Sequence, residues 1–211
     1  MQTTPPTVLL FLKAPRPGFV KTRLAVDLGD DIACEIFKSL ASQTLATIPS
    51  DWPIRVFFTP SDALLEMTNW LGNSSTFLPQ IEGDLGQRLE AATRETFANG
   101  ASSVILLGGD CPGITTDHLN KAAQCLANKQ AVIGPAADGG YWLLGLPKDA
   151  PEAFQDITWS SDSVFSTTLN KLATLDLSPH QLETLEDVDD IDAWTRAQAK
   201  HPNLKKLSPI S

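Results

Sequence analysis

The sequence predicts an α/β fold in which a mostly parallel β-sheet is covered by helices on both faces. The predicted strands are short and continuously apolar, as at residues 104–107, which is typical of strands buried on both faces of a parallel sheet. These runs alternate along the chain with amphipathic segments of helical period, and that alternation indicates a doubly wound sheet. The 211 residues suffice for one buried core, so we expect a single domain over residues 1–211.

Each element is bounded by residues that start or stop it. We expect strands at residues 8–12, 54–58, 76–78, 104–107, 131–134 and 141–146. Helices are expected at residues 30–48, in a short segment ending near 72, at 84–99, from about 116 to 126, at 163–175, and in a terminal segment that carries Trp194. Pro49 ends the first helix, because proline cannot continue one. The turn signal Asp138-Gly139-Gly140 makes a hairpin one interpretation of residues 131–146.

Composition and charge exclude several classes of function. The formal net charge is -9, whereas a nucleic-acid binder normally presents a basic face. No apolar run reaches membrane-spanning length and the N-terminus lacks the pattern of a signal peptide, so we expect a cytoplasmic protein. The three cysteines form no Cys-x-x-Cys pair, which argues against a disulfide framework and a zinc site.

A basic loop follows the first predicted strand. Residues 1–26 contain no acidic side chain, yet Lys13, Arg16, Lys21 and Arg23 fall close together there. An acidic protein that concentrates positive charge in one loop is expected to bind an anion with it. The glycine that a Walker motif requires before the lysine is absent, and no Gly-x-Gly-x-x-Gly run occurs, so neither a P-loop nor a dinucleotide site is predicted.

Asp110 is the principal candidate for a metal ligand. It follows the strand at residues 104–107 and two glycines, and therefore lies at the carboxyl end of a strand, where ligands bind in open α/β sheets. A carboxylate there can hold a divalent cation against phosphates. The structural alternative is a helix cap, but Asp117 is better spaced for that role.

Three further stretches carry polar or aromatic candidates. Asp84 is as well suited to cap a helix as to bind a ligand, and Arg88 lies one turn further on. Gly139, Gly140 and Tyr141, together with Trp159, Ser161 and Asp162, are candidates for binding a sugar or a base, although turns, caps and core packing explain most of them individually. The acids of residues 186–192 either complement a helix dipole or include a second metal ligand.

The assembled stretches resemble a known bacterial family. They are FLKAPRPGFVKTRLA (11–25), EGDLGQRL (82–89), LLGGDCPGIT (106–115), GPAADGGYWLLGL (134–146), ITWSSDSVF (157–165) and EDVDDID (186–192). The chain is similar to DUF2064-type proteins, which include glycosyltransferases of arsenosugar biosynthesis and belong to the nucleotide-diphospho-sugar transferase superfamily. More distantly it resembles molybdenum-cofactor and phospholactate guanylyltransferases.

The resemblance implies a glycosyltransferase-A fold, a Rossmann-like three-layer sandwich with a mixed, mostly parallel sheet. It places a nucleotide under the first loop, and so implies that Lys13, Gly18, Lys21, Thr22 and Arg23 bind phosphate, together with Asp84 and Arg88. It also implies Mg²⁺ or Mn²⁺ at Asp110, with Asp189 as a second ligand.

Three functions are compatible with these residues. In a transferase that uses a nucleotide-diphosphate sugar, Lys21 and its neighbours would neutralise the diphosphate, and Asp138 would orient or deprotonate a small-molecule acceptor. In a nucleotidyltransferase the same groups would bind an NTP and a phosphorylated acceptor, and pyrophosphate would leave. A non-catalytic nucleotide-binding protein is the third. We expect the first, with no nucleic-acid or membrane partner.

Overall fold

The computed structural model describes residues 4–202 and 204, and the expected fold is confirmed. Its seven-stranded sheet has the order β3-β2-β1-β4-β6-β5-β7. The strands are β1 (Thr7–Lys13), β2 (Ile54–Thr59), β3 (Thr76–Pro79), β4 (Val104–Leu107), β5 (Val132–Pro135), β6 (Tyr141–Leu146) and β7 (His180–Gln181). Strand β6 runs antiparallel to β4 and β5, and every other pairing is parallel. The hairpin interpretation of residues 131–146 is therefore correct.

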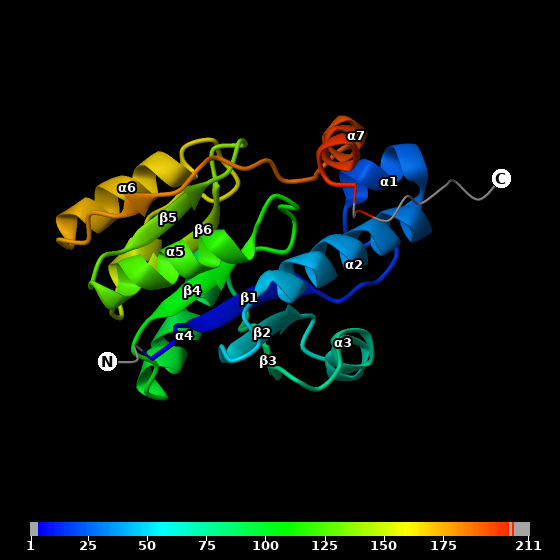
Figure 1. The fold of residues 1–211 in the computed structure, drawn as a ribbon. Coiled ribbons are helices and arrows are strands. Elements are labelled where there is room, and N and C mark those ends of the chain that lie inside the picture. The colour runs from blue at the N-terminus through cyan, green and yellow to red at the C-terminus, as the bar shows by residue number, and fades with distance from the viewer. Residues whose placement is uncertain (1–3, 203, 205–211) are drawn as a thin grey trace.

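Helices cover both faces of this sheet, as Figure 1 shows. They are α1 (Thr22–Leu28), α2 (Asp30–Thr47), α3 (Leu64–Leu71), α4 (Leu85–Ala98), α5 (Thr116–Ala127), η1 (Pro151–Phe154), α6 (Val164–Thr174) and α7 (Ile191–Lys200). Helices α2, α3 and α5 pack on one face, and α4, η1 and α6 pack on the other. A third cluster joins α1, α2 and α7 beyond the edge of the sheet. Among these helices, none is both long and apolar enough to cross a bilayer.

The side chains of β1 show how one strand supports both layers. Val8 and Leu10 pack under α2 and α5, whereas Leu9 and Phe11 face α4 and α6. Successive side chains of a strand point to opposite faces, so a strand with helices on both sides must be apolar throughout. All four residues of β4 are buried for the same reason.

Three short elements, α1, η1 and β7, are absent from the sequence-based expectations. Helix α1 has seven residues, no acidic side chain in its first turn and no side-chain cap, so the usual signals of a helix start are missing. Its N-cap residue, Lys21, has the left-handed conformation, with φ 48°. Strand β7 has only two residues, too few to show a period.

The segment after β7 returns to the carboxyl edge of the sheet. Leu185 forms a parallel bridge with Ala136, and Val188 donates its N–H to the carbonyl of Asp110 at 3.0 Å. These backbone contacts bring the acids near the C-terminus beside the turn that follows β4. The functional edge of the sheet is thus assembled from segments that lie about 80 residues apart in the chain.

Gly139 connects the turn after β5 to the loop before α6. Its φ of +91° favours glycine, and a Cβ atom there would overlap the carbonyl oxygen of Asp162 and lie 2.5 Å from its Cα. The carbonyl of Gly139 in turn accepts a hydrogen bond of 2.8 Å from the N–H of Phe165. Close approach of two backbones therefore fixes the position of residues 160–162.

We expect Gly139→Ala to lower the free energy of unfolding by about 2–3 kcal/mol, because it combines a strained φ with a backbone clash. Gly100→Ala is the matched control, since Gly100 has the same φ of +91° but nothing within 4 Å of its Cβ position. That control should cost only about 1 kcal/mol. Urea denaturation of both variants measures the difference, and equal losses would contradict the tight contact with Asp162.

Candidate functional site

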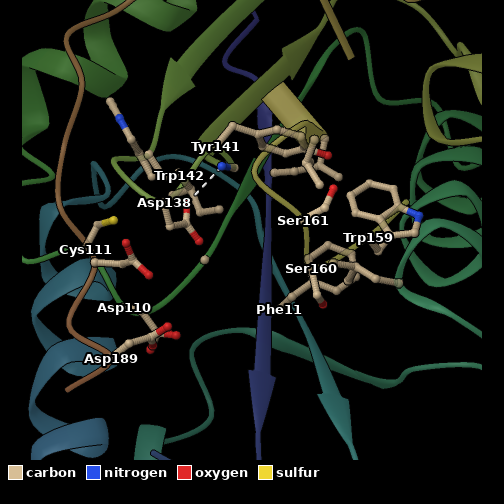
Figure 2. A pocket seen from close by; sticks show the side chains of 18 of the residues that line it. Phe11, Asp110, Cys111, Asp138, Tyr141, Trp142, Trp159, Ser160, Ser161 and Asp189 are labelled. Atoms are coloured by element: carbon tan, nitrogen blue, oxygen red, sulfur yellow. Dashed lines mark hydrogen bonds between the residues drawn. The ribbon is translucent and has the colours of Figure 1, made fainter. Parts of the chain in front are cut away.

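A cavity of about 550 Å³ opens at the carboxyl edge of the sheet, between the turns after β4 and β5. Figure 2 shows that its walls differ in chemistry. One end holds carboxylates and the other holds aromatic rings. The acidic residues that line the cavity are Asp110, Asp138, Asp162, Asp187 and Asp189, and the basic one within the described part of the chain is Arg23.

Lys21 links two of these carboxylates. Its ammonium lies 3.1 Å from Oδ2 of Asp110 and 3.0 Å from Oδ1 of Asp189, and its side chain is only 4% exposed. Burial lowers the pKa of Lys21, but the attraction of Asp110 and Asp189 outweighs it and raises that pKa above its ordinary value. The lysine therefore stays charged at neutral pH. Arg23 adds a looser contact to Asp189, at 3.6 Å.

The backbone of Asp110 is held by a hydrogen bond, whereas one oxygen of its carboxylate accepts none from the described residues. Its carbonyl accepts the N–H of Val188 at 3.0 Å, which aligns Asp110 with the acidic segment near the C-terminus. Its Oδ1 atom is buried and has no hydrogen-bond partner in the part of the chain described. A buried carboxylate oxygen without a partner is costly unless a ligand satisfies it.

Asp187 is a residue of the site that the sequence analysis did not single out. Burial and the neighbouring carboxylates of Asp138 and Asp189 raise its pKa to about 6. Asp187 and Asp189 both line the cavity, while Val188 between them is buried in the core. In an extended segment, alternate side chains point to the same side. The pattern acid–apolar–acid at residues 187–189 therefore predicts that Asp187 and Asp189 face the cavity together.

Asp138 and Cys111 complete the acidic end. Oδ1 of Asp138 accepts the N–H of Gly140 at 2.8 Å, which orients the carboxylate within its turn. Cys111 also lines the cavity, but burial and nearby carboxylates raise the pKa of its thiol well above the ordinary value. It is therefore a neutral thiol at physiological pH and a poor nucleophile.

The aromatic end is formed by Phe11, Tyr141 and Trp159. Gly86, in the first turn of α4, allows the indole of Trp159 to approach closely, because a Cβ there would lie 2.5 Å from Nε1. The Tyr141 hydroxyl is buried without a partner among the described residues, and burial raises its pKa above the ordinary value. Ser161 lines the same end and donates its hydroxyl to the carbonyl of Thr158 at 2.6 Å.

Several residues predicted to bind ligands lie outside the cavity lining. Those that do line it are Arg23, Asp110, Asp138, Gly140, Tyr141, Trp159, Ser161, Asp162 and Asp189. The others are Lys13, Gly18, Thr22, Asp84, Arg88, Gly139 and Lys21, of which Lys21 still contacts the lining carboxylates. Arg88 has a buried Nε atom without a partner in the described chain.

Asp84 and Arg16, which the sequence suggested as ligand-binding groups, have partners within the protein instead. The carboxylate of Asp84 accepts the N–H of Gln87 at 2.9 Å in a capping box, so it starts helix α4. Arg16 pairs with Glu66 at 2.6 Å and with Asp62 at 3.1 Å, which ties the basic loop to the start of α3. The positive charge near the cavity therefore comes from Lys21 and Arg23.

Carboxylate oxygens at the acidic end are suitable ligands for a hard divalent cation, but those of the described residues are too few to hold one by themselves. Within residues 4–202 and 204, no three His, Cys, Asp or Glu side chains are arranged to hold a metal ion together. Asp110 and Asp189 nevertheless offer carboxylate oxygens close to one cation, Lys21, and Asp110 keeps an oxygen without a partner. Mg²⁺ is commonly held by one or two carboxylates plus substrate phosphates.

A family model described as uncharacterized proteins conserved in bacteria, DUF2064, matches residues 44–161. The chain belongs to the DUF2064 family. The matched segment of this DUF2064 protein includes Asp110, Asp138 and Trp159, whereas Lys21 and Asp189 lie outside it. A search of curated proteins found no match.

Solved structures place the DUF2064 chain in a fold of transferases. A candidate nucleotide-diphospho-sugar transferase from Desulfovibrio desulfuricans G20 is 32% identical, with a TM-score of 0.87 over 93% of this chain and 88% of that one. A 4-diphosphocytidyl-2C-methyl-D-erythritol synthase from Anaerococcus prevotii is 9% identical, with a TM-score of 0.60 over 94% and 97%. Rv0371c of Mycobacterium tuberculosis, solved in complex with manganese, is 13% identical, with a TM-score of 0.55 over 91% and 97%. The two distant matches show the fold alone.

We expect Lys21→Met to lower the free energy of unfolding by about 2 kcal/mol at low salt, because it leaves two carboxylates facing each other without their cation. Mn²⁺ should then raise the melting temperature of Lys21→Met more than that of the wild type, since the metal can replace the lost charge. Thermal denaturation with and without Mn²⁺ measures both effects. Lys38→Met is the control, because Lys38 pairs with Glu35 on the outside of α2. A Mn²⁺ shift no larger in Lys21→Met than in the wild type would count against a cation site at these carboxylates.

Proposed function

We propose that this DUF2064 protein is a metal-dependent glycosyltransferase that takes a nucleotide-diphosphate sugar as donor and a small molecule as acceptor. One observation carries the proposal. A single cavity joins the Lys21–Asp110–Asp189 cluster to an aromatic wall, so the diphosphate of a donor and a ring-shaped substrate can be bound side by side. The likeness to a candidate nucleotide-diphospho-sugar transferase at 32% identity supports the same donor class.

The two basic residues supply the charge that a leaving diphosphate needs. Lys21 is buried, charged and positioned by two carboxylates, so it is preorganised rather than solvated. Preorganised charge stabilises a developing anion more than a flexible surface lysine does. Arg23, whose side chain is 80% exposed, can turn towards phosphate oxygens from the rim.

Asp138 is positioned to handle the proton of the acceptor. Its Oδ1 is anchored by the N–H of Gly140, and the carboxylate faces the cavity at its acidic end (Figure 2). In the proposed step Asp138 accepts the proton of an acceptor hydroxyl, the oxygen bonds to the anomeric carbon, and the bond from that carbon to the diphosphate breaks. The nucleoside diphosphate leaves with the bonding electrons.

Asp110 and Asp189 would hold the metal, with Lys21 displaced towards the phosphates or retained as a second cation. Mg²⁺ or Mn²⁺ bound there would supply Lewis-acid stabilisation of the diphosphate. The carboxylate oxygens are the ligands that such hard cations prefer.

The alternative function is nucleotidyl transfer, which releases pyrophosphate from an NTP. A distant neighbour of the same fold is a 4-diphosphocytidyl-2C-methyl-D-erythritol synthase. In a nucleotidyltransferase, the triphosphate of the NTP would have to lie on the basic loop that follows β1. Here Pro15, Arg16 and Pro17 occupy that loop, and Arg16 is engaged by Asp62 and Glu66. These contacts favour a diphosphate donor.

The product released distinguishes the two functions. We expect a nucleoside diphosphate from a panel of nucleotide sugars with Mn²⁺, and no pyrophosphate from the four NTPs with sugar phosphates. Chromatography of both mixtures makes the comparison. Pyrophosphate from the second mixture, with no nucleoside diphosphate from the first, would favour the nucleotidyltransferase.

We expect Asp110→Asn to abolish Mn²⁺-dependent binding of the nucleotide sugar that the panel identifies, because an amide is a poor ligand for a hard cation. Calorimetric titration measures this binding, and Asp149→Asn, at an exposed position outside the cavity lining, is the control. Undiminished Mn²⁺-dependent binding by Asp110→Asn would contradict the metal assignment.

A further inference from the structure

Some charged residues of the cavity are not assigned to the donor, and these residues indicate what kind of acceptor the protein uses. Lys21, Arg23, Asp110 and Asp189 belong to the diphosphate end. The other acids that line the cavity are Asp138, Asp162 and Asp187. No basic side chain lines that remaining part within the described residues. An acceptor hydroxyl that reaches Asp138 therefore meets a negative field from Asp138, Asp162 and Asp187, beside the diphosphate end.

The opposite end of the cavity, which would receive the rest of the acceptor, is apolar and aromatic. Phe11, Tyr141 and Trp159 present ring surface, and Leu85 and Leu89 of α4 add aliphatic surface. Burial of the Tyr141 hydroxyl raises its pKa, so it contributes no further charge. Such walls bind the C–H faces of a ring or an alkyl chain, but they cannot replace the water around a phosphate or a carboxylate.

We propose that the acceptor is an alcohol that carries neither a phosphate nor a carboxylate group. This rests on the proposed glycosyl transfer and sharpens it, because a nucleotidyltransferase of this fold would have to admit a phosphorylated acceptor at the same place. A phosphate monoester bears nearly two negative charges at neutral pH, so the three carboxylates repel it.

Asp162 is the residue that tests the proposal most safely. Its backbone packs against Gly139, but its side chain is exposed at the rim of the cavity, so substitution there should not disturb the fold. Asp149 is the matched control, since it is an exposed aspartate of the same charge that does not line the cavity.

The experiment compares two probes that differ by one phosphate group, 4-nitrophenyl β-D-glucoside and its 6-phosphate, and the Asp162 variants isolate the part of the difference that is due to charge. Pyrophosphate and Mn²⁺ are added first, so that the diphosphate end is filled and cannot capture the phosphorylated probe. Equilibrium dialysis then gives both dissociation constants. We expect the uncharged glucoside to bind at least about tenfold more tightly. Asp162→Asn should narrow this preference about threefold and Asp162→Lys about tenfold, whereas Asp149→Asn should leave it unchanged.

Trp159→Ala tests whether the uncharged glucoside binds against the aromatic wall. It should weaken the uncharged glucoside about tenfold, because ring stacking is lost, without changing the affinity for pyrophosphate. Equal or tighter binding of the phosphorylated probe, binding of neither probe, or a preference that Asp162→Lys does not alter would overturn the proposal. The measurement involves no turnover and no nucleotide, so a failed transferase assay beside an intact preference would overturn only the proposed glycosyl transfer.

Discussion

The site depends on one buried ammonium ion. Lys21 lies between Asp110 and Asp189 at about 3 Å from each, and its side chain is almost fully buried. A buried charge is tolerated only when it is paired, and two close carboxylates repel each other unless a cation lies between them. The start of α1, the turn after β4 and the segment before α7 therefore have to come together at this point.

This pairing places a positive charge beside the cavity of an acidic protein. The chain carries a formal net charge of -9, yet the ammonium ion of Lys21 contacts two of the carboxylates that line the cavity. Local preorganised charge acts at short range in a partly buried site, whereas the excess of surface acids is screened by salt. The carboxylates gather at one end of the cavity and the aromatic rings at the other, so the two ends are chemically different.

Backbone packing holds the rest of the cavity in place. Gly139 brings residues 160–162 against the turn after β5, and Gly86 admits the indole of Trp159. The polar and aromatic residues of the site lie on loops, but these loops are fixed by contacts that leave no room for a Cβ atom. Loops supported in this way can present side chains as precisely as regular elements do.

The sequence by itself determined the fold and placed Asp110 at the carboxyl edge of the sheet. Continuous apolar runs predict buried strands, and the glycine turn after β4 places Asp110 at the carboxyl end of one, because local patterns are set by short-range sterics and burial. Only the tertiary structure decided how the charges are paired. It paired Arg16 with Asp62 and Glu66, paired Lys21 with Asp189, and brought the segment that carries Asp187 beside Asp110. Those pairings join residues 46 to 168 positions apart, and the distance between such residues is set by packing of the whole chain rather than by any local pattern.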